Sequence, residues 1–196
     1  MNAGVRPTFA MTYDLAEHRH RFAVWAAARA AQRGFTSVKR LRDALEATSI
    51  RADLRVPDTL ALERAGFDQI HLGWCRSICT TLNDWNVQKV AFGRAAKLIA
   101  IYLKAMVLMG GHWDTPLARC MHPPLDRILL QALAATSDEK ISSPHKGAWR
   151  RINWTRLDEA AYYQLIDQLR AVKPPILPFW RIEEYWQPSD AADSAV

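Results

Sequence analysis

The amino-acid sequence predicts an all-α protein that folds as a single globular multi-helix domain over residues 1–188. Apolar residues recur at helical spacing along almost the whole chain, and no segment alternates apolar and polar residues as a strand does. The chain has 196 residues and is 49% hydrophobic, which is enough to bury a core without disulfide staples. The remaining residues, 189–196, are expected to form a flexible acidic tail.

Residues that begin and end helices occur along the whole chain. Long helices are predicted at residues 14–33, 38–48, 67–83, 87–109, 125–135 and 156–172. Gly34 is a residue type that ends helices. Ser37 and Asn86 are expected to cap the helices that follow them, because their side chains can accept bonds from the free amides of a first turn. Gly110 and Gly111 close the helix 87–109.

The second half of the chain is divided by prolines and polar segments. Pro123 and Pro124 are expected to open the helix 125–135, since proline is tolerated in a first helical turn. A polar loop is expected at 136–147. Thr155, with Asp158 three residues later, resembles a capping box for the helix 156–172. Two short helices are also expected, at 59–64 and 176–186.

The charge of the chain is positive and unevenly distributed. The net charge is +6, with ten Lys and Arg against five acids in residues 1–57, and four acids without a base in 183–196. A basic body attracts polyanions through counterion release, which favours nucleic acid as a partner. A solvated basic surface without such a partner is the alternative interpretation.

The sequence also restricts the location of the protein. No stretch reaches the roughly 18 apolar residues of a membrane span, so no membrane partner is expected. The segment 1–18 lacks the continuous apolar core of a secretory signal. Cys75, Cys79 and Cys120 are too few to form a disulfide framework. We therefore expect a cytoplasmic protein.

The helix 87–109 is apolar almost all round, yet it carries three cations on one side. Arg94, Lys97 and Lys104 are spaced by three and seven residues, which places them on one helical face. One interpretation is a narrow solvated stripe, in which lysine stems extend outward to water. The other is that one lysine sits in a partly desolvated cleft, where its pKa drops and its amine becomes a nucleophile.

A second candidate element is the sequence HPPLD, whose aspartate, Asp126, stands 29 residues after Lys97. Asp126 falls at the start of the next helix, where a carboxylate interacts favourably with free amides even without a catalytic role. His122, before the two prolines, is either a structural hydrogen-bond partner or part of a pocket. The order of a central lysine helix, a loop and an aspartate at a helix start favours the functional interpretation.

These two segments, FGRAAKLIAIYLKAM and HPPLD, resemble the catalytic core of helix-hairpin-helix DNA glycosylases, and the archaeal oxoguanine DNA glycosylase branch most closely. In that superfamily a lysine near the start of a buried helix is followed by an aspartate at the start of a later helix. The resemblance implies an all-α fold, with Lys97 as the lysine and Asp126 as the aspartate. The glycine-rich turn of the family is reduced here to Phe92-Gly93-Arg94.

The resemblance further implies a mechanism and a partner. The expected partner is double-stranded DNA from which an oxidised or otherwise modified base, phage-type hypermodified bases included, is flipped into a pocket. Lys97 attacks the sugar, displaces the base and forms a Schiff base that permits strand nicking, while Asp126 stabilises the positive charge that develops on the sugar. Lys104 is the backup nucleophile, and Arg94 is expected to hold a phosphate. No cofactor is implied.

Several other residues are candidates for contacts with DNA or with the flipped base. Candidates for the base pocket, although residues of these types more often have a structural place, are Trp74, Trp113, His122 and Trp180. Trp180 and Trp186 together indicate that the C-terminal segment packs over the rest of the domain, and we call this segment the C-terminal clasp. Cations expected to contact phosphates are Arg94, Lys104, Lys146, Arg150 and Arg151.

Other function classes stay open or are set aside. His71, Cys75 and Cys79 lie on one helical face, but ligands from a single helix rarely complete a zinc site, so no metal is expected. The leading interpretation is a DNA glycosylase for base excision, with possible lyase activity on abasic sites. The alternatives are a non-catalytic all-α nucleic-acid-binding protein, or a toxin-type or phage-defence protein whose helical body binds a partner protein.

Overall fold

The fold is built around α5 (Phe92–Leu103), a helix with buried residues on almost every side. The computed structural model describes residues 13–54, 64–139, 141–172 and 177–187, which contain helices and no strand. The other helices are α1 (Leu15–Gln32), α2 (Val38–Glu46), α3 (Ile50–Asp53), α4 (Arg64–Asp84), α6 (Pro116–Cys120), α7 (Arg127–Ala135), α8 (Lys146–Trp149) and α9 (Glu159–Ala171). A π-helix, η2 (Lys104–Leu108), continues α5, and two 3₁₀ helices are η3 (Trp154–Arg156) and η4 (Phe179–Tyr185).

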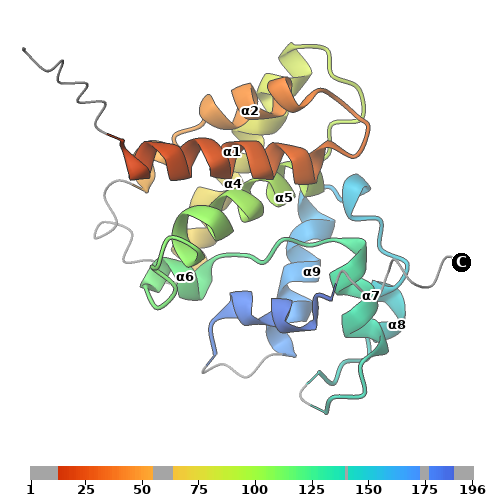
Figure 1. The fold of residues 1–196 in the computed structure, drawn as a ribbon. Coiled ribbons are helices and arrows are strands. Elements are labelled where there is room, and N and C mark those ends of the chain that lie inside the picture. Colours follow the sequence, from red (N-terminus) through yellow and green to blue (C-terminus); the bar gives the residue numbers. More distant parts are fainter. Residues whose placement is uncertain (1–12, 55–63, 140, 173–176, 188–196) are drawn as a thin grey trace, which may run out of the picture.

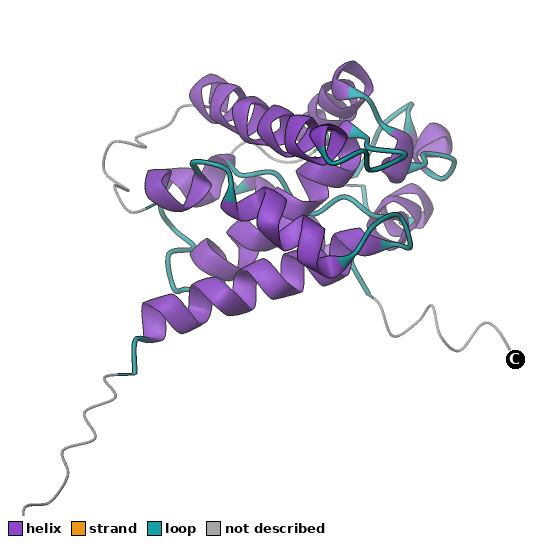
Figure 2. Ribbon diagram, turned by 90° about the horizontal axis from the view of Figure 1, so that it is seen from above, coloured by secondary structure: helices purple, strands orange, loops and turns teal. Residues whose placement is uncertain are grey.

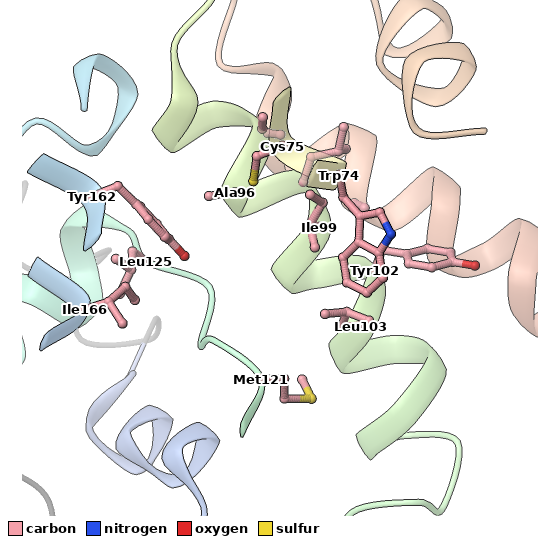
Figure 3. Packing of buried hydrophobic residues seen from close by; sticks show 14 of the residues in the cluster. Trp74, Cys75, Ala96, Ile99, Tyr102, Leu103, Met121, Leu125, Tyr162 and Ile166 are labelled. Carbon is pink, nitrogen blue, oxygen red and sulfur yellow. The ribbon is translucent and has the colours of Figure 1, made fainter. Parts of the chain in front are cut away.

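Two groups of helices enclose α5 and share one core. Figure 1 shows α1 and α2 on one side of it and α7, α8 and α9 on the other, and Figure 2 shows the same helices from above. Helices α1, α4, η3 and α9 all contact α5. Figure 3 shows buried side chains of α5 together with those of α4, of α9 and of the segment 121–126; the labelled residues are Trp74, Cys75, Ala96, Ile99, Tyr102, Leu103, Met121, Leu125, Tyr162 and Ile166. The described residues therefore form a single all-α domain, as the sequence predicted.

The predicted helices 14–33, 38–48 and 67–83 are confirmed as α1, α2 and α4. The side chain of Asp14 accepts hydrogen bonds from the first turn of α1, and Ser37 caps α2 as expected. The short helices α3, α6 and α8 were not predicted. In the structure α3 contacts α2, α6 contacts α4 and η4, and α8 contacts α7.

The predicted start of the central helix was wrong. Asn86 does not cap it, because Asn86 and Lys89 adopt left-handed backbone conformations with φ of 56° and 60°. Instead α5 begins at Phe92, and the amide of Gly93 donates to the carbonyl of Leu157 at 3.0 Å. The C-terminal end is confirmed, since the φ of 89° at Gly111 turns the chain away from the helix.

Two other predicted helix starts were also wrong. Pro123 and Pro124 lie in an extended segment, 121–126, and the helix begins only at Arg127 because Asp126 is its N-cap. Likewise Asp158 caps α9 alone, through a 2.8 Å bond from the amide of Ala161, while Thr155 belongs to η3. In both places an aspartate is the N-cap of the helix. The sequence had instead predicted that the two prolines begin α7 and that Thr155 caps α9.

Some predicted segments lie outside the described residues. They are residues 59–63 of the predicted helix 59–64, residue 176 of the predicted helix 176–186, and the whole predicted tail 189–196. The rest of the segment 176–186 contains the 3₁₀ helix η4. None of the helices in the described part of the chain has the length and apolar character that crossing a membrane requires.

We predict opposite effects of alanine at two helical glycines. A Cβ atom at Gly93 would lie 2.1 Å from the carbonyl oxygen of Trp154, so Gly93→Ala forces α5 and η3 apart and destabilises the protein by about 1–3 kcal/mol. A Cβ at Gly73, in the exposed middle of α4, meets no atom within 4 Å, so Gly73→Ala stabilises the protein by about 0.5–1 kcal/mol. Urea unfolding of both variants tests this, and a neutral Gly93→Ala would contradict it.

Candidate active site

Lys97 and Asp126 form a buried ion pair at the centre of the molecule. The Lys97 Nζ donates to Asp126 Oδ2 at 3.1 Å, and the two side chains are only 5% and 9% exposed. These are the two residues that the sequence singled out, and they come from separate elements, α5 and the N-cap of α7. The expectation that they share one site is therefore supported by their geometry.

Local backbone structure fixes both partners of this pair. Lys97 lies one helical turn after Gly93, the point at which α5 packs directly against η3. Asp126 uses its other oxygen, Oδ1, to accept from the amide of Leu129 at 2.9 Å, which caps α7. Because one oxygen caps the helix, the second is held in place toward Lys97.

Two tryptophans enclose the ion pair. The Lys97 ammonium lies 4.6 Å from the ring centroid of Trp154, at the distance of a cation–π interaction. The indole N–H of Trp186 donates to Asp126 Oδ2 at 3.1 Å, the same oxygen that accepts from Lys97. Trp154 is buried, whereas Trp186 is 38% exposed. The site is therefore closed by a fixed ring on one side and by a partly exposed ring on the other.

A second ion pair lies beside the first. Lys104 donates to Glu183, which comes from the 3₁₀ helix η4, and the Lys104 ammonium lies 5.6 Å from the ring of Trp186. The Glu183 Oε1 atom and the indole N–H of Trp180 are both buried and have no hydrogen-bond partner. An unsatisfied acceptor and an unsatisfied donor thus lie on the same short helix, beside the half-buried Lys104, and could bond to a polar ligand.

The electrostatics of the site act on both Lys97 and Glu183. Burial lowers the pKa of Lys97 below the usual lysine value, although the attraction of Asp126 opposes this effect and the nearby Arg33 adds to it. Burial raises the pKa of Glu183, against the stabilising bond from Lys104. Lowering of the lysine pKa brings its neutral, nucleophilic form closer to neutral pH.

A buried polar network holds the segment that leads to Asp126. His122 is fully buried, its Nε2 lies 2.8 Å from Asp68 Oδ1, and its Nδ1 lies 3.1 Å from the hydroxyl of Tyr162. Arg170 also donates to both oxygens of Asp68 at 2.7 Å. Burial lowers the pKa of His122 to about 4, so the imidazole is neutral at pH 7. The network ties the 121–126 segment to α4 and α9.

The other predicted base-pocket residues do not gather at this site. Both ring nitrogens of His122 are engaged in the network described above, and Trp74 is buried with its N–H on Asp53 at 2.8 Å. Trp113 is 58% exposed on the loop before α6. Only Trp180, on η4, shares its element with Glu183. Three of the four base-pocket predictions thus correspond to other structural positions.

The cations predicted to contact phosphates do not lie on one surface. Arg150 and Arg151 line an open pocket together with Trp154. Arg94 lines a neighbouring pocket, and its guanidinium stacks on Phe35 at 4.1 Å. Lys146 instead donates to the carbonyl of Thr136 at 2.7 Å, and Lys104 is paired with Glu183 as described above. The shared helical face of Arg94, Lys97 and Lys104 therefore does not produce one shared contact surface.

Sequence reasoning missed three contributors to the site. Trp154, Glu183 and Trp186 each contact the buried lysines or Asp126, yet all three stand in segments without a strong helical pattern. The one available signal was the concentration of aromatic and acidic residues at 179–186, which indicated a C-terminal clasp. That clasp was not connected with Lys97.

Neither a metal site among the described residues nor a similarity to known proteins assigns a function to the chain. No group of three or more His, Cys, Asp or Glu side chains that could hold a metal ion occurs among the residues that the structure describes. Comparison of the chain with protein-family models, with curated proteins and with solved structures gave no match.

We predict strong coupling between the two partners of the buried ion pair. Asp126→Asn keeps an oxygen for capping α7 but leaves the buried ammonium of Lys97 unpaired, which costs about 3–5 kcal/mol of unfolding free energy. The double variant Lys97→Met/Asp126→Asn removes that charge, so its loss is smaller than the sum of the two single losses. Urea unfolding of the three variants gives the coupling, and additive losses would contradict the ion pair.

Proposed function

We propose that the protein is a DNA glycosylase that removes an oxidised or otherwise modified base through a Schiff base on Lys97. The observation that carries this proposal is the buried Lys97–Asp126 pair, with 3.1 Å between Nζ and Oδ2, enclosed by Trp154 and Trp186. Desolvation favours the neutral, nucleophilic form of a lysine amine, and the neighbouring carboxylate can accept its proton. The resemblance of the two segments to helix-hairpin-helix glycosylases agrees with it.

The first step is attack by the neutral amine of Lys97. Burial favours this neutral form, and Asp126 can take the proton that the ammonium loses, because its Oδ2 is already in hydrogen-bond contact with Nζ. The electron pair of Nζ then forms a bond to the sugar C1′. The bond between C1′ and the base breaks, and its electron pair leaves with the base. The departing base takes the proton that Asp126 received from Lys97, so Asp126 is a carboxylate again as the base leaves.

Asp126 has a second role in this step. Positive charge develops on the sugar as the base departs, and a carboxylate fixed by the helix cap stabilises that charge without reorganising. Opening of the sugar ring then gives the protonated Schiff base between Lys97 and C1′. Loss of a proton from C2′ expels the 3′ phosphate and nicks the strand, which is the lyase reaction.

The second ion pair provides groups for the extruded base. Lys104 offers a charged donor, Glu183 an acceptor, and Trp186 a ring face on which a base can stack. The base would enter from the side of Trp186, because that ring is partly exposed whereas Trp154 is buried. Binding then exchanges the bond from Trp186 to Asp126 for contacts with the substrate.

A non-catalytic nucleic-acid-binding protein is the second candidate. Arg150 and Arg151 are exposed at an open pocket, and neither is paired with a described carboxylate, so this surface favours a polyanion whether or not Lys97 reacts. The two candidates differ in one respect, which is the formation of a covalent bond to DNA.

We predict that borohydride traps the protein on duplex DNA with an abasic site. Reduction of the Schiff base leaves a covalent adduct that denaturing electrophoresis detects. Lys97→Gln abolishes the adduct, whereas Lys104→Gln, which removes the neighbouring lysine, retains it. An adduct that survives Lys97→Gln and is lost in Lys104→Gln would identify Lys104 as the nucleophile in place of Lys97. Binding without any adduct favours the non-catalytic candidate. Circular dichroism of each variant verifies folding.

We also predict the pH dependence of trapping. Only the neutral amine attacks, so the trapping rate rises with pH and reaches its plateau once Lys97 has lost its proton. Because burial lowers the pKa of Lys97, that rise is centred below the ordinary lysine value of 10.5. Asp126→Asn removes the carboxylate that favours the ammonium, so the midpoint shifts to still lower pH while the plateau rate falls. A midpoint at or above 10.5 contradicts a desolvated amine.

A further inference from the structure

Two adjoining pockets meet at Asn153, and together we call them the Asn153 groove. One, of about 320 Å³, extends toward Arg127, Arg150 and Arg151, and the other, of about 470 Å³, extends toward Lys89, Arg94 and Arg156. Asn153 lines both pockets. Each thus receives three cations, from separate segments of the chain.

The charge of this groove is uncompensated. No acidic side chain is among the described residues that line either pocket. In the part of the chain that the structure describes, none of these six cations forms an ion pair, although many other lysines and arginines of the protein do. Like charges repel one another, so six unpaired cations around one groove favour an anionic ligand.

Arg94 gives independent support for a ligand. The residue is only 9% exposed, its Nε atom is buried without a hydrogen-bond partner, and its Nη1 donates a long 3.5 Å bond to the carbonyl of Gln32. The guanidinium stacks on Phe35, and burial lowers its pKa. A buried, unsatisfied arginine that lines a pocket is suited to an anion in that pocket.

The groove ends at the wall of the candidate active site. Trp154 lines the pocket of Arg150 and Arg151, and its ring lies 4.6 Å from the ammonium of Lys97. Arg127, in the same pocket, directly follows Asp126 in the chain. A chain of phosphates in the groove would therefore run past the point at which Lys97 is buried.

We propose that the Asn153 groove binds the phosphodiester backbone of the DNA strand that carries the target nucleotide. The assignment of the strand rests on the proposed function, because it places the reacting sugar near Lys97. The phosphate contacts themselves do not require the reaction. The two pockets hold phosphates on either side of Asn153, and the cations contribute affinity without reading base sequence.

Salt-dependent binding tests the groove. The probe is a fluorescein-labelled duplex with a stable abasic analogue, measured by anisotropy at several salt concentrations. The variants are Arg150→Gln/Arg151→Gln and Lys89→Gln/Arg127→Gln, and the matched control is Arg40→Gln/Arg42→Gln, which removes two exposed, unpaired arginines from α2. Each groove pair should reduce the slope of log affinity against log salt by about two, since each phosphate contact contributes roughly 0.9.

Two further arms identify the ligand. Methylphosphonate linkages beside the abasic analogue should weaken binding when they stand in its own strand, and should have little effect in the opposite strand. Inorganic phosphate at matched ionic strength should not compete more than chloride does, because the groove requires linked phosphates. A larger effect in the opposite strand overturns the assignment of the strand, and competition by free phosphate overturns the assignment of a phosphodiester backbone as the ligand.

The outcome is separable from that of the proposed function. Borohydride trapping at low salt should persist in the groove variants, with a yield that falls as salt rises. Unchanged salt slopes in both groove variants would falsify the groove even if trapping on Lys97 succeeds. Reduced slopes without any adduct retain the phosphate groove and remove the glycosylase. Thermal unfolding of the variants excludes loss of fold as the cause.

Discussion

The structure depends on one costly interaction, a lysine and an aspartate brought together inside an apolar core. Removing two charges from water is unfavourable unless their geometry is fixed and their other bonds are satisfied. Here the carboxylate of Asp126 accepts hydrogen bonds from Lys97, from Trp186 and from the amide of Leu129, so both of its oxygens are paired. Stability alone gives little reason to keep such a pair, because apolar residues of similar volume serve a core equally well. Chemistry that needs a desolvated amine does give a reason.

The rest of the fold can be understood as support for that pair. Gly93 allows α5 to approach η3, and this places Trp154 over Lys97. The network of His122, Asp68 and Arg170 anchors the extended segment that ends in Asp126. The 3₁₀ helix η4 then closes the site with Glu183 and Trp186. These contacts join segments that lie far apart in the chain, so the pair is formed only when the domain is complete.

The sequence predicted the helices that carry strong periodicity, and it predicted the two central residues. Lys97 could be identified because a charge in an apolar helix is conspicuous, and Asp126 because it stands where a helix begins. Boundaries failed where a tertiary contact decided them, as at Asn86, whose left-handed backbone belongs to a loop. Glu183 and Trp186 could not be assigned because a short 3₁₀ helix has no periodic signature and because their partners, Lys104 and Asp126, are 79 and 60 residues away. His122 resembled a pocket residue, but it is an internal anchor.

The protonation of Lys97 in the folded protein is the most direct test of this account. NMR titration of the lysine ε-methylene groups, with the Lys97 signal assigned by its loss in Lys97→Gln, reports the pKa of that amine. We expect a Lys97 signal that titrates below 10.5, because burial lowers the pKa of this amine. A Lys97 that titrates at or above 10.5 would show an ordinary stabilised ammonium, and the buried pair would then be structural rather than catalytic.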